Sequence, residues 1–163
     1  ASFHPAAVMA KPSLRKLCSL RGHDERVWNV AWRPQCRRPM LASSGADQAI
    51  RLWGGSGSDW SLILEIDTSE HHSRTMRSLA WNVDGTKLAV ASFDATISVW
   101  KVVPGSETPG CLSMECATVL SGHENEVKSV AYSPSGQLFA SCSRDRSVWV
   151  YDAQETDEYE CVA

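Results

Sequence analysis

The three side-chain types of a hydrolytic triad occur in one stretch of the chain as His123, Ser141 and Asp145, with Ser143 as a second serine. In a triad the imidazole takes the proton of the serine hydroxyl, and the carboxylate orients the ring. The same types return twice in the same order, as His23, Ser43 and Asp47 and as His72, Ser92 and Asp94. An active site is normally one constellation in one cleft. Threefold recurrence therefore favours a structural role over catalysis.

The residues that must position these groups also repeat at fixed intervals. An aromatic residue follows each histidine by nine positions, and another follows each aspartate by six. These pairs are Trp32 and Trp53, Trp81 and Trp100, and Tyr132 and Tyr151. Successive aspartates are 47 and 51 residues apart, near the ~40–45 residues of a four-stranded propeller blade plus some loop. The period therefore predicts an array of β-propeller blades.

The first copy carries two extra residues. Its first aromatic residue and its aspartate are fifteen positions apart, whereas the other copies have thirteen. The extra residues fall between Arg33 and Pro39, a proline-punctuated turn in which insertions are tolerated. We expect the adjacent basic residues Arg37 and Arg38 to lie on this solvated loop.

Local patterns agree with an all-β fold. The period-two alternation in Ile97–Trp100 and Val148–Tyr151 predicts half-buried strands. Asp84-Gly85 and Ser135-Gly136 have the chemistry of hairpin turns. No stretch shows the pattern of an amphipathic helix.

Each copy resembles the WD-repeat family, most clearly through Gly122-His123 and Tyr151-Asp152. Some positions depart from the family signature. Gly54 and Lys101 replace the usual aspartate, and His71 replaces the usual glycine. The resemblance implies an all-β WD-repeat β-propeller of roughly seven four-stranded blades, of which this chain holds about three.

The expected organisation follows from this resemblance. Residues 1–13 are predicted to be a flexible N-terminal tail, and residues 14–163 to form repeats at roughly 21–66, 70–120 and 121–163. We expect the last blade to lack most of its outer strand, and Leu14 to Leu20 to supply the outer strand of the ring's final blade. The chain would then be the N-terminal part of a propeller, either cut or paired with a second chain that carries the complementary blades.

The resemblance also implies a role for the repeated polar residues. In WD-repeat proteins the histidine, a serine or threonine, the hairpin aspartate and the strand-end aromatic residue form a hydrogen-bonded cluster, which a buried carboxylate requires. The predicted members are His23, Asp47, Trp53, His72, Asp94, Trp100, His123, Asp145 and Tyr151. The middle copy has Val90 where the others have Ser43 and Ser141, so its cluster is predicted to lack one hydroxyl.

Residues that change from copy to copy are the candidates for function. In this architecture three such positions lie near the rim of the central channel. They combine Trp28 and Phe93 with arginines, as protein-binding hot spots do. Arg144 is the strongest candidate, because its planar fork suits a partner's carboxylate. The predicted partner-binding residues are Arg144, Phe93, Trp28, Arg77, Lys128, Glu126 and Arg26. The alternative is that Trp28 and Phe93 only pack against neighbouring loops.

Composition excludes several function classes. Hydrophobic residues make up 43% of the chain and charged residues 21%, as in an ordered globular domain. The net charge of −3 offers no general attraction for phosphate backbones, so we expect no nucleic-acid binding. No apolar run approaches the ~18 residues of a membrane span, and no signal peptide is evident. We expect an intracellular protein without membrane contact.

The cysteines predict neither a metal site nor disulfide bonds. They are Cys18, Cys36, Cys111, Cys116, Cys142 and Cys161. No two have Cys-x-x-Cys spacing, and Cys116 and Cys161 fall at equivalent positions of different blades, too far apart to bridge. We expect free thiols, no metal and no cofactor.

Two stretches resemble one branch of the family, the cytosolic iron-sulfur assembly WD-repeat proteins. The first runs from Gly122 to Val150, and the second from Ala91 to Lys101. Trp53-Gly54 and Asp59-Trp60 agree with the same branch. The resemblance implies a non-catalytic scaffold of the targeting complex that delivers iron-sulfur clusters to cytosolic and nuclear apoproteins.

The resemblance also implies partners and a location. The partners would be a MIP18-type protein, a HEAT-repeat adaptor, an iron-only-hydrogenase-like protein and the iron-sulfur client proteins. The location would be the cytoplasm, with the nucleus as a second compartment. The alternative is a generic WD-repeat interaction adaptor, such as a ubiquitin-ligase substrate receptor. Neither is an enzyme.

Overall fold

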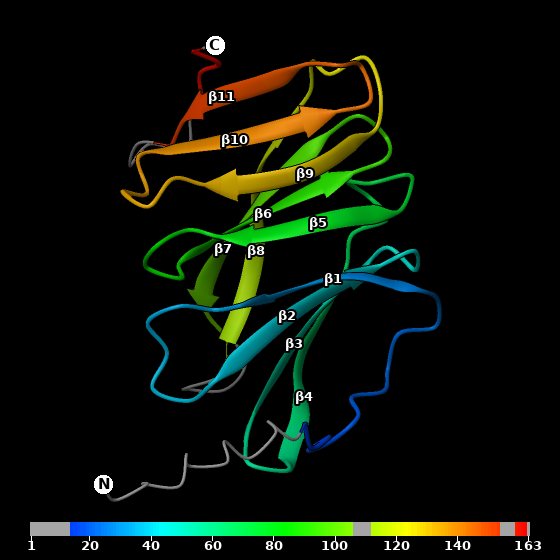
Figure 1. Cartoon of the computed structure of the whole chain (residues 1–163), viewed down its shortest axis with the longest axis vertical. Coiled ribbons are helices and arrows are strands. Elements are labelled where there is room, and N and C mark those ends of the chain that lie inside the picture. Colours follow the sequence, from blue (N-terminus) through cyan, green and yellow to red (C-terminus); the bar gives the residue numbers. More distant parts are fainter. Residues whose placement is uncertain (1–13, 106–111, 154–158, 163) are drawn as a thin grey trace, which may run out of the picture.

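The computed structural model describes residues 14–105, 112–153 and 159–162 (Figure 1). Within these ranges the chain forms strands β1 to β11 and no helix, so the prediction of an all-β fold is confirmed. The tail predicted at residues 1–13 and the thiol of Cys111 lie outside the described residues. The described part contains no helix long and apolar enough to cross a membrane.

The strands form three antiparallel sheets, which we call blades 1, 2 and 3. Blade 1 contains β1 (Val27–Trp32), β2 (Met40–Gly45), β3 (Ala49–Ser56) and β4 (Asp59–Asp67) in that order. Blade 2 contains β5 (Met76–Trp81), β6 (Lys87–Ser92), β7 (Ile97–Pro104) and β8 (Leu112–Leu120) in the same arrangement. Blade 3 contains β9 (Val127–Tyr132), β10 (Leu138–Ser143) and β11 (Val148–Asp152).

Blade 3 has the beginning of a fourth strand at the edge of β11. Tyr151 and Cys161 form an antiparallel bridge. The amide of Asp152 donates to the carbonyl of Glu160 at 2.9 Å, and the amide of Val162 donates to the carbonyl of Val150 at 2.8 Å. Residues 159–162 therefore lie where β4 and β8 lie in the other blades.

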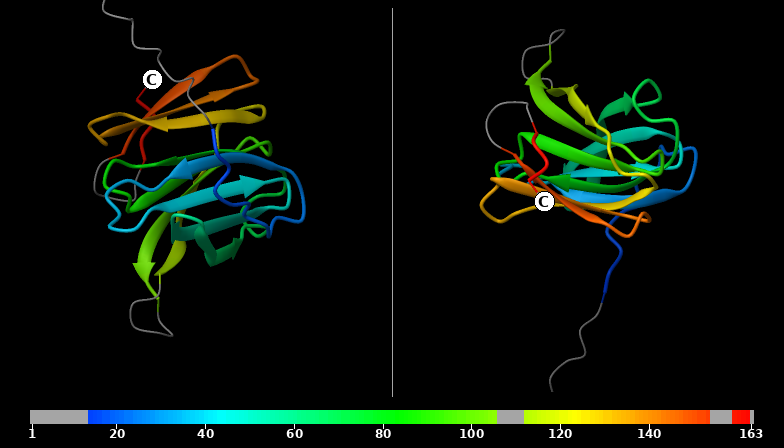
Figure 2. Two further views of the ribbon diagram at one scale, coloured as in Figure 1. Left: turned by 60° about the horizontal axis from the view of Figure 1, so that its bottom comes forward. Right: turned by 90° about the horizontal axis from the view of Figure 1, so that it is seen from above.

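The blades stack face to face, with β5 packed between β1 and β9 (Figure 1). The view from above in Figure 2 looks along the stack, with blade 3 nearest the viewer. The alternation of side chains along β6 explains the stacking. Leu88 and Val90 join the core shared with blade 1. Ala89 and Ala91 join the core shared with blade 3. The middle blade is therefore covered on both faces.

The two end blades are covered on one face only. On β1, Val30 and Trp32 are 57% and 61% exposed. On β11, Val148 is 64% exposed. Burial of apolar surface is the main driving force of folding and association, so each end of the stack retains an apolar face that further protein surface would cover.

Residues 14–20, expected to be an outer strand, contain no strand in this structure. Leu17, Cys18 and Leu20 instead line an apolar hollow of about 350 Å³ against Trp32, Leu41 and Trp60. The Trp32 and Trp60 rings meet edge to face at 5.6 Å. The segment thus contacts blade 1, and its place in another blade's sheet stays a prediction.

Candidate protein-interaction face

The repeated polar residues meet inside each blade. In blade 1, His23 Nδ1 lies 2.8 Å from Asp47 Oδ2, and His23 Nε2 lies 2.7 Å from Ser43 Oγ. The indole N–H of Trp53 donates to the same Ser43 Oγ at 2.8 Å. We assign the Ser43 proton to His23 Nε2, a tautomer that leaves the Nδ1 proton for the carboxylate.

Blade 3 repeats this geometry with a tyrosine in place of the tryptophan. His123 Nδ1 lies 2.7 Å from Asp145 Oδ2, and His123 Nε2 lies 2.7 Å from Ser141 Oγ. Burial raises the pKa of the Tyr151 phenol above its ordinary value, although its hydrogen bond with Ser141 acts in the opposite direction. Burial therefore favours the neutral phenol.

Blade 2 corrects one prediction from the sequence. Its cluster does not lack a hydroxyl, because Ser98 of β7 supplies it in place of Val90. Ser98 Oγ lies 2.7 Å from His72 Nε2 and accepts from the Trp100 indole N–H at 2.7 Å. Val90 and Ser98 are directly paired across β6 and β7. The hydroxyl is thus supplied by the neighbouring strand, and it meets the same two partners as in blade 1, a histidine and a tryptophan.

The cluster serines are buried too deeply to act as nucleophiles. Ser43, Ser98 and Ser141 are 3%, 0% and 2% exposed. In blades 1 and 2 the serine oxygen also accepts an indole N–H at the position from which it would attack. A substrate carbonyl has no route to these hydroxyls, so the arrangement fits a structural cluster and does not fit a triad.

The environment of each aspartate favours its ionised form. Burial opposes ionisation of Asp94, yet hydrogen bonds from His72 and Thr96 outweigh it and lower the pKa of this carboxyl well below its ordinary value. The Ser147 hydroxyl, followed by His123, lowers the pKa of Asp145 in the same way. Each carboxylate accordingly accepts hydrogen bonds from the turn that follows it.

Blade 1 contains a buried cation, Arg51, that was not predicted from the sequence. Arg51 is 3% exposed and occupies the position of Ser98 in blade 2. Its guanidinium lies 2.6 Å from Asp47 Oδ2 and 2.9 Å from Glu65 Oε1. Burial opposes ionisation of Asp47, but Arg51 and then His23 lower its pKa. The signal available in the sequence was an arginine between the apolar residues Ile50 and Leu52.

The candidate binding residues lie where the first strand of each blade carries a β-bulge. The pairing of β1 with β2 skips Trp28, that of β5 with β6 skips Arg77, and that of β9 with β10 skips Lys128. A bulge leaves one residue unpaired and redirects its side chain. The three variable side chains are therefore turned out of the regular ladder at the same point in each blade.

These bulged cations cross the junctions between blades. Arg77 of blade 2 lies with its guanidinium carbon 5.1 Å from the centre of the Trp28 ring of blade 1. Lys128 of blade 3 lies with Nζ 4.0 Å from the centre of the Phe93 ring of blade 2. Arg74 covers Phe93 as well, at 6.0 Å. Cation–π contacts thus join each blade to the next at this end.

Glu126 is the centre of a charge cluster at the same end. Its carboxylate lies 2.8 Å from Lys128 Nζ, 3.3 Å from Arg74 Nη2 and 3.6 Å from Arg144 Nη1. Lys128 is the largest cause of a lowered pKa for Glu126. One carboxylate faces three cations, and the Arg144 side chain is 67% exposed. The cluster is therefore a positive surface with donors still open to solvent.

We use the name rim for the residues of this end that these contacts join. They are Trp28, Arg74, Arg77, Phe93, Glu126, Lys128 and Arg144. Arg26 stays apart from them, because its carbonyl accepts the Ala46 amide at 2.9 Å while its exposed side chain meets no partner among the described residues. Arg74, which lies three residues before Arg77, was not among the residues predicted from the sequence.

The sequence profile of the WD domain, G-beta repeat, matches residues 14–54, 56–101 and 114–152. The chain belongs to this WD-repeat family. The WD40 repeats of RRP9, known from a crystal structure, superpose with a TM-score of 0.69 at 23% identity over 86% of this chain and 39% of that one. This similarity supports the propeller fold alone.

Relatives of this WD-repeat chain share more sequence. One is the probable cytosolic iron-sulfur protein assembly protein 1 of Vanderwaltozyma polyspora, 39% identical over 91% of this chain and 46% of that protein. Another, of the same name, is from Mycosarcoma maydis, 35% identical over 92% of this chain and 40% of that protein. A probable cytosolic Fe-S cluster assembly factor of Schizosaccharomyces japonicus is 40% identical over 88% of this chain and 22% of that protein. The chain spans less than half the length of each.

Proposed function

We propose that this chain is a non-catalytic scaffold in cytosolic iron-sulfur protein assembly and that it binds its partners through the rim. The assembly role rests on similarity to proteins of that name over 91% of the chain. The scaffold role rests on one structural observation. The side chains that the blade template leaves free are bulged at the start of the first strand in every blade, along one edge of the array, where Arg144 and Trp28 remain accessible.

The chemistry of the rim suggests what it binds. Arg74, Lys128 and Arg144 face a single carboxylate there, that of Glu126. Trp28, 40% exposed, adds an apolar surface beside Arg77. A partner segment that combines acidic and apolar side chains would satisfy both, and electrostatic attraction would raise its association rate.

The proposed partners are a MIP18-type protein, a HEAT-repeat adaptor, an iron-only-hydrogenase-like protein and iron-sulfur client proteins. The proposed location is the cytosol, where the relatives' names place them, with the nucleus as a second compartment. Complementary propeller blades would cover the end faces of the stack. In this scheme the chain positions other proteins, and the chemistry of the cluster belongs to them.

The rim geometry also suits a WD-repeat adaptor of another class, such as a ubiquitin-ligase substrate receptor. Affinity purification of the tagged chain from cytosolic extract, followed by mass spectrometry, separates the two functions. We expect recovery of iron-sulfur assembly proteins, and loss of cluster from cytosolic iron-sulfur enzymes when the gene is silenced. Recovery of a ligase scaffold, with iron-sulfur enzymes unaffected, would support the other class.

A further inference from the structure

The first residues of the long turn between β1 and β2 are held by contacts with blade 2. Arg33 Nε donates to the carbonyl of Gly85 at 2.7 Å, and the Arg33 guanidinium lies 5.5 Å from the centre of the Trp81 ring. A Cβ on Gly85 would come within 2.6 Å of the Pro34 carbonyl oxygen. Blade 2 thus holds the first residues of the turn in place, and Arg33 is oriented before any ligand arrives.

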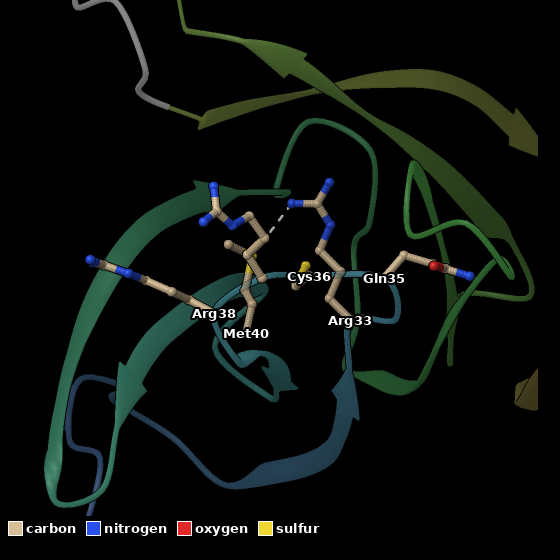
Figure 3. Close-up of a pocket in the computed structure, with 6 residues that line it drawn as sticks. Arg33, Gln35, Cys36, Arg38 and Met40 are labelled. Carbon is tan, nitrogen blue, oxygen red and sulfur yellow. Dashed lines mark hydrogen bonds between the residues drawn. The ribbon is translucent and has the colours of Figure 1, made fainter.

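A hollow of about 660 Å³ opens on this turn (Figure 3). Its lining residues are Arg33, Gln35, Cys36, Arg37, Arg38 and Met40. Figure 3 shows Arg33 and Arg38 extending in different directions from the loop on either side of Cys36. The hollow follows the C-terminal end of β1, whereas Trp28 and the rim lie at the other end of that strand. It is therefore a second surface, at the opposite end of the strands from the rim.

The charges of the hollow are not balanced within the protein. Three of its lining residues are arginines and none is acidic. Arg37 and Arg38 are exposed, and neither meets a side-chain or carbonyl partner in the described part of the chain. Arg33 directs Nη1 to the Met40 sulfur at 3.7 Å, a weak acceptor. The unbalanced arginines stand on the one turn that is longer than its counterparts in the other blades.

We propose that this hollow binds a phosphorylated serine or threonine of a partner protein. A phosphate monoester carries about −1.5 to −2 charges and three acceptor oxygens, which suit several guanidinium groups better than one carboxylate would. Nucleic acid is disfavoured, because the chain has a net charge of −3 and the lining includes no aromatic ring on which a base could stack. The inference is independent of the proposed function, which concerns the rim at the other end of the strands.

The test is a binding titration monitored by fluorescence anisotropy. The probe is a labelled peptide, Gly-pSer-Gly-pSer-Gly, compared with its unphosphorylated form and with a single-stranded oligonucleotide of equal charge. We expect saturable binding of the phosphopeptide, competition by inorganic phosphate, and at least roughly tenfold weaker binding of the other two probes at moderate salt. The whole chain is used in the assembly state in which it purifies.

Two charge-reversal variants separate the site from general electrostatics. The double variant Arg37→Glu, Arg38→Glu should weaken phosphopeptide binding about tenfold or more. The matched control Arg15→Glu, Lys16→Glu changes the net charge equally on another exposed segment and should stay within about twofold of the parent. Equal weakening by both pairs, or tighter binding of the oligonucleotide than of the phosphopeptide, would overturn the inference. Circular dichroism of both variants verifies that the strands are retained.

Discussion

A Cβ atom on Gly122 would lie 2.5 Å from the Trp149 ring, so this glycine is needed to admit that side chain. In blade 1 the glycine faces a different ring, because a Cβ on Gly22 would lie 3.1 Å from Trp53, whereas Arg51, the counterpart of Trp149, lies 3.5 Å away. In blade 2, Ser98 occupies the position that Trp149 occupies in blade 3, and His71 occupies the position of Gly122. The His71 ring packs edge to face on Trp100 at 5.3 Å. The departure at His71 is thus compensated within its own blade.

Gly122→Ala should therefore destabilise blade 3 by about 1–3 kcal/mol, the usual range for overpacking a filled site. The added methyl group meets an indole ring, and the φ of +151° is unfavourable for alanine. Gly57→Ala is the control, since nothing lies within 4 Å of a Cβ there and only its φ of +58° opposes the change. Urea unfolding should show the larger loss for Gly122→Ala and partial recovery on adding Trp149→Ser. Equal losses at the two glycines would contradict the packing explanation.

Ser98→Ala should cost about 1–3 kcal/mol of unfolding free energy, because it leaves His72 Nε2 and the Trp100 indole N–H without their shared partner. Ser44→Ala is a matched control. Ser44 is equally buried, and its hydroxyl has no partner within the described structure. Its removal should change stability by less than about 0.5 kcal/mol. If the two variants melt alike, the hydroxyl of Ser98 does not stabilise the blade.

The sequence allowed the array and the cluster members to be predicted, because fixed intervals such as that from His123 to Tyr132 report the strand and turn lengths of one blade. It did not reveal that Ser98 replaces the hydroxyl missing at Val90. That substitution depends on the register of β6 with β7, which the spacing does not contain. The contact of Arg77 with Trp28 could not be predicted from the sequence either, since it depends on how two blades pack together.

The stability of the chain should fall below about pH 4, as the aspartates of the clusters are protonated. The pKa of Asp94 is lower in the folded than in the unfolded chain. Its stabilisation is therefore fully present above the unfolded pKa and is lost as the pH falls toward the folded value. Asp94→Asn should be less stable than the parent at pH 7, and its stability should change less as the pH falls. Urea midpoints measured from pH 7 to 3 check both. Asp59→Asn, an exposed control on β4, should retain the parent profile.

Arg144→Glu should weaken partner capture while changing stability by less than about 0.5 kcal/mol, because the side chain is 67% exposed. An arginine at the centre of an interface can contribute about 2 kcal/mol or more to binding. The new carboxylate would also face Glu126 and make the cluster less positive. Arg146→Glu is the matched control, because it makes an equal charge reversal on another exposed side chain two residues along the turn. Pull-down yields that are equal for the parent and both variants would exclude Arg144 as a binding residue.

The last prediction concerns the apolar end faces of the stack. Val30 and Trp32 on β1 and Val148 on β11 are each more than half exposed. Stability in repeat arrays resides largely in the interfaces between neighbours. In isolation we expect the chain to associate with itself and to bind a hydrophobic dye, as judged by sedimentation velocity and dye fluorescence.

Two comparisons identify the cause of this association. Val30→Thr with Trp32→Gln should reduce both dye binding and association, whereas Val119→Thr, on the outer strand of the covered middle blade, should leave them unchanged. Adding the part of the Vanderwaltozyma polyspora relative that lies outside the matched region should replace self-association by a defined complex. That region is expected to supply blades whose apolar faces cover both ends at once. A compact, cooperatively melting monomer that binds no dye would show instead that three blades are sufficient without neighbours.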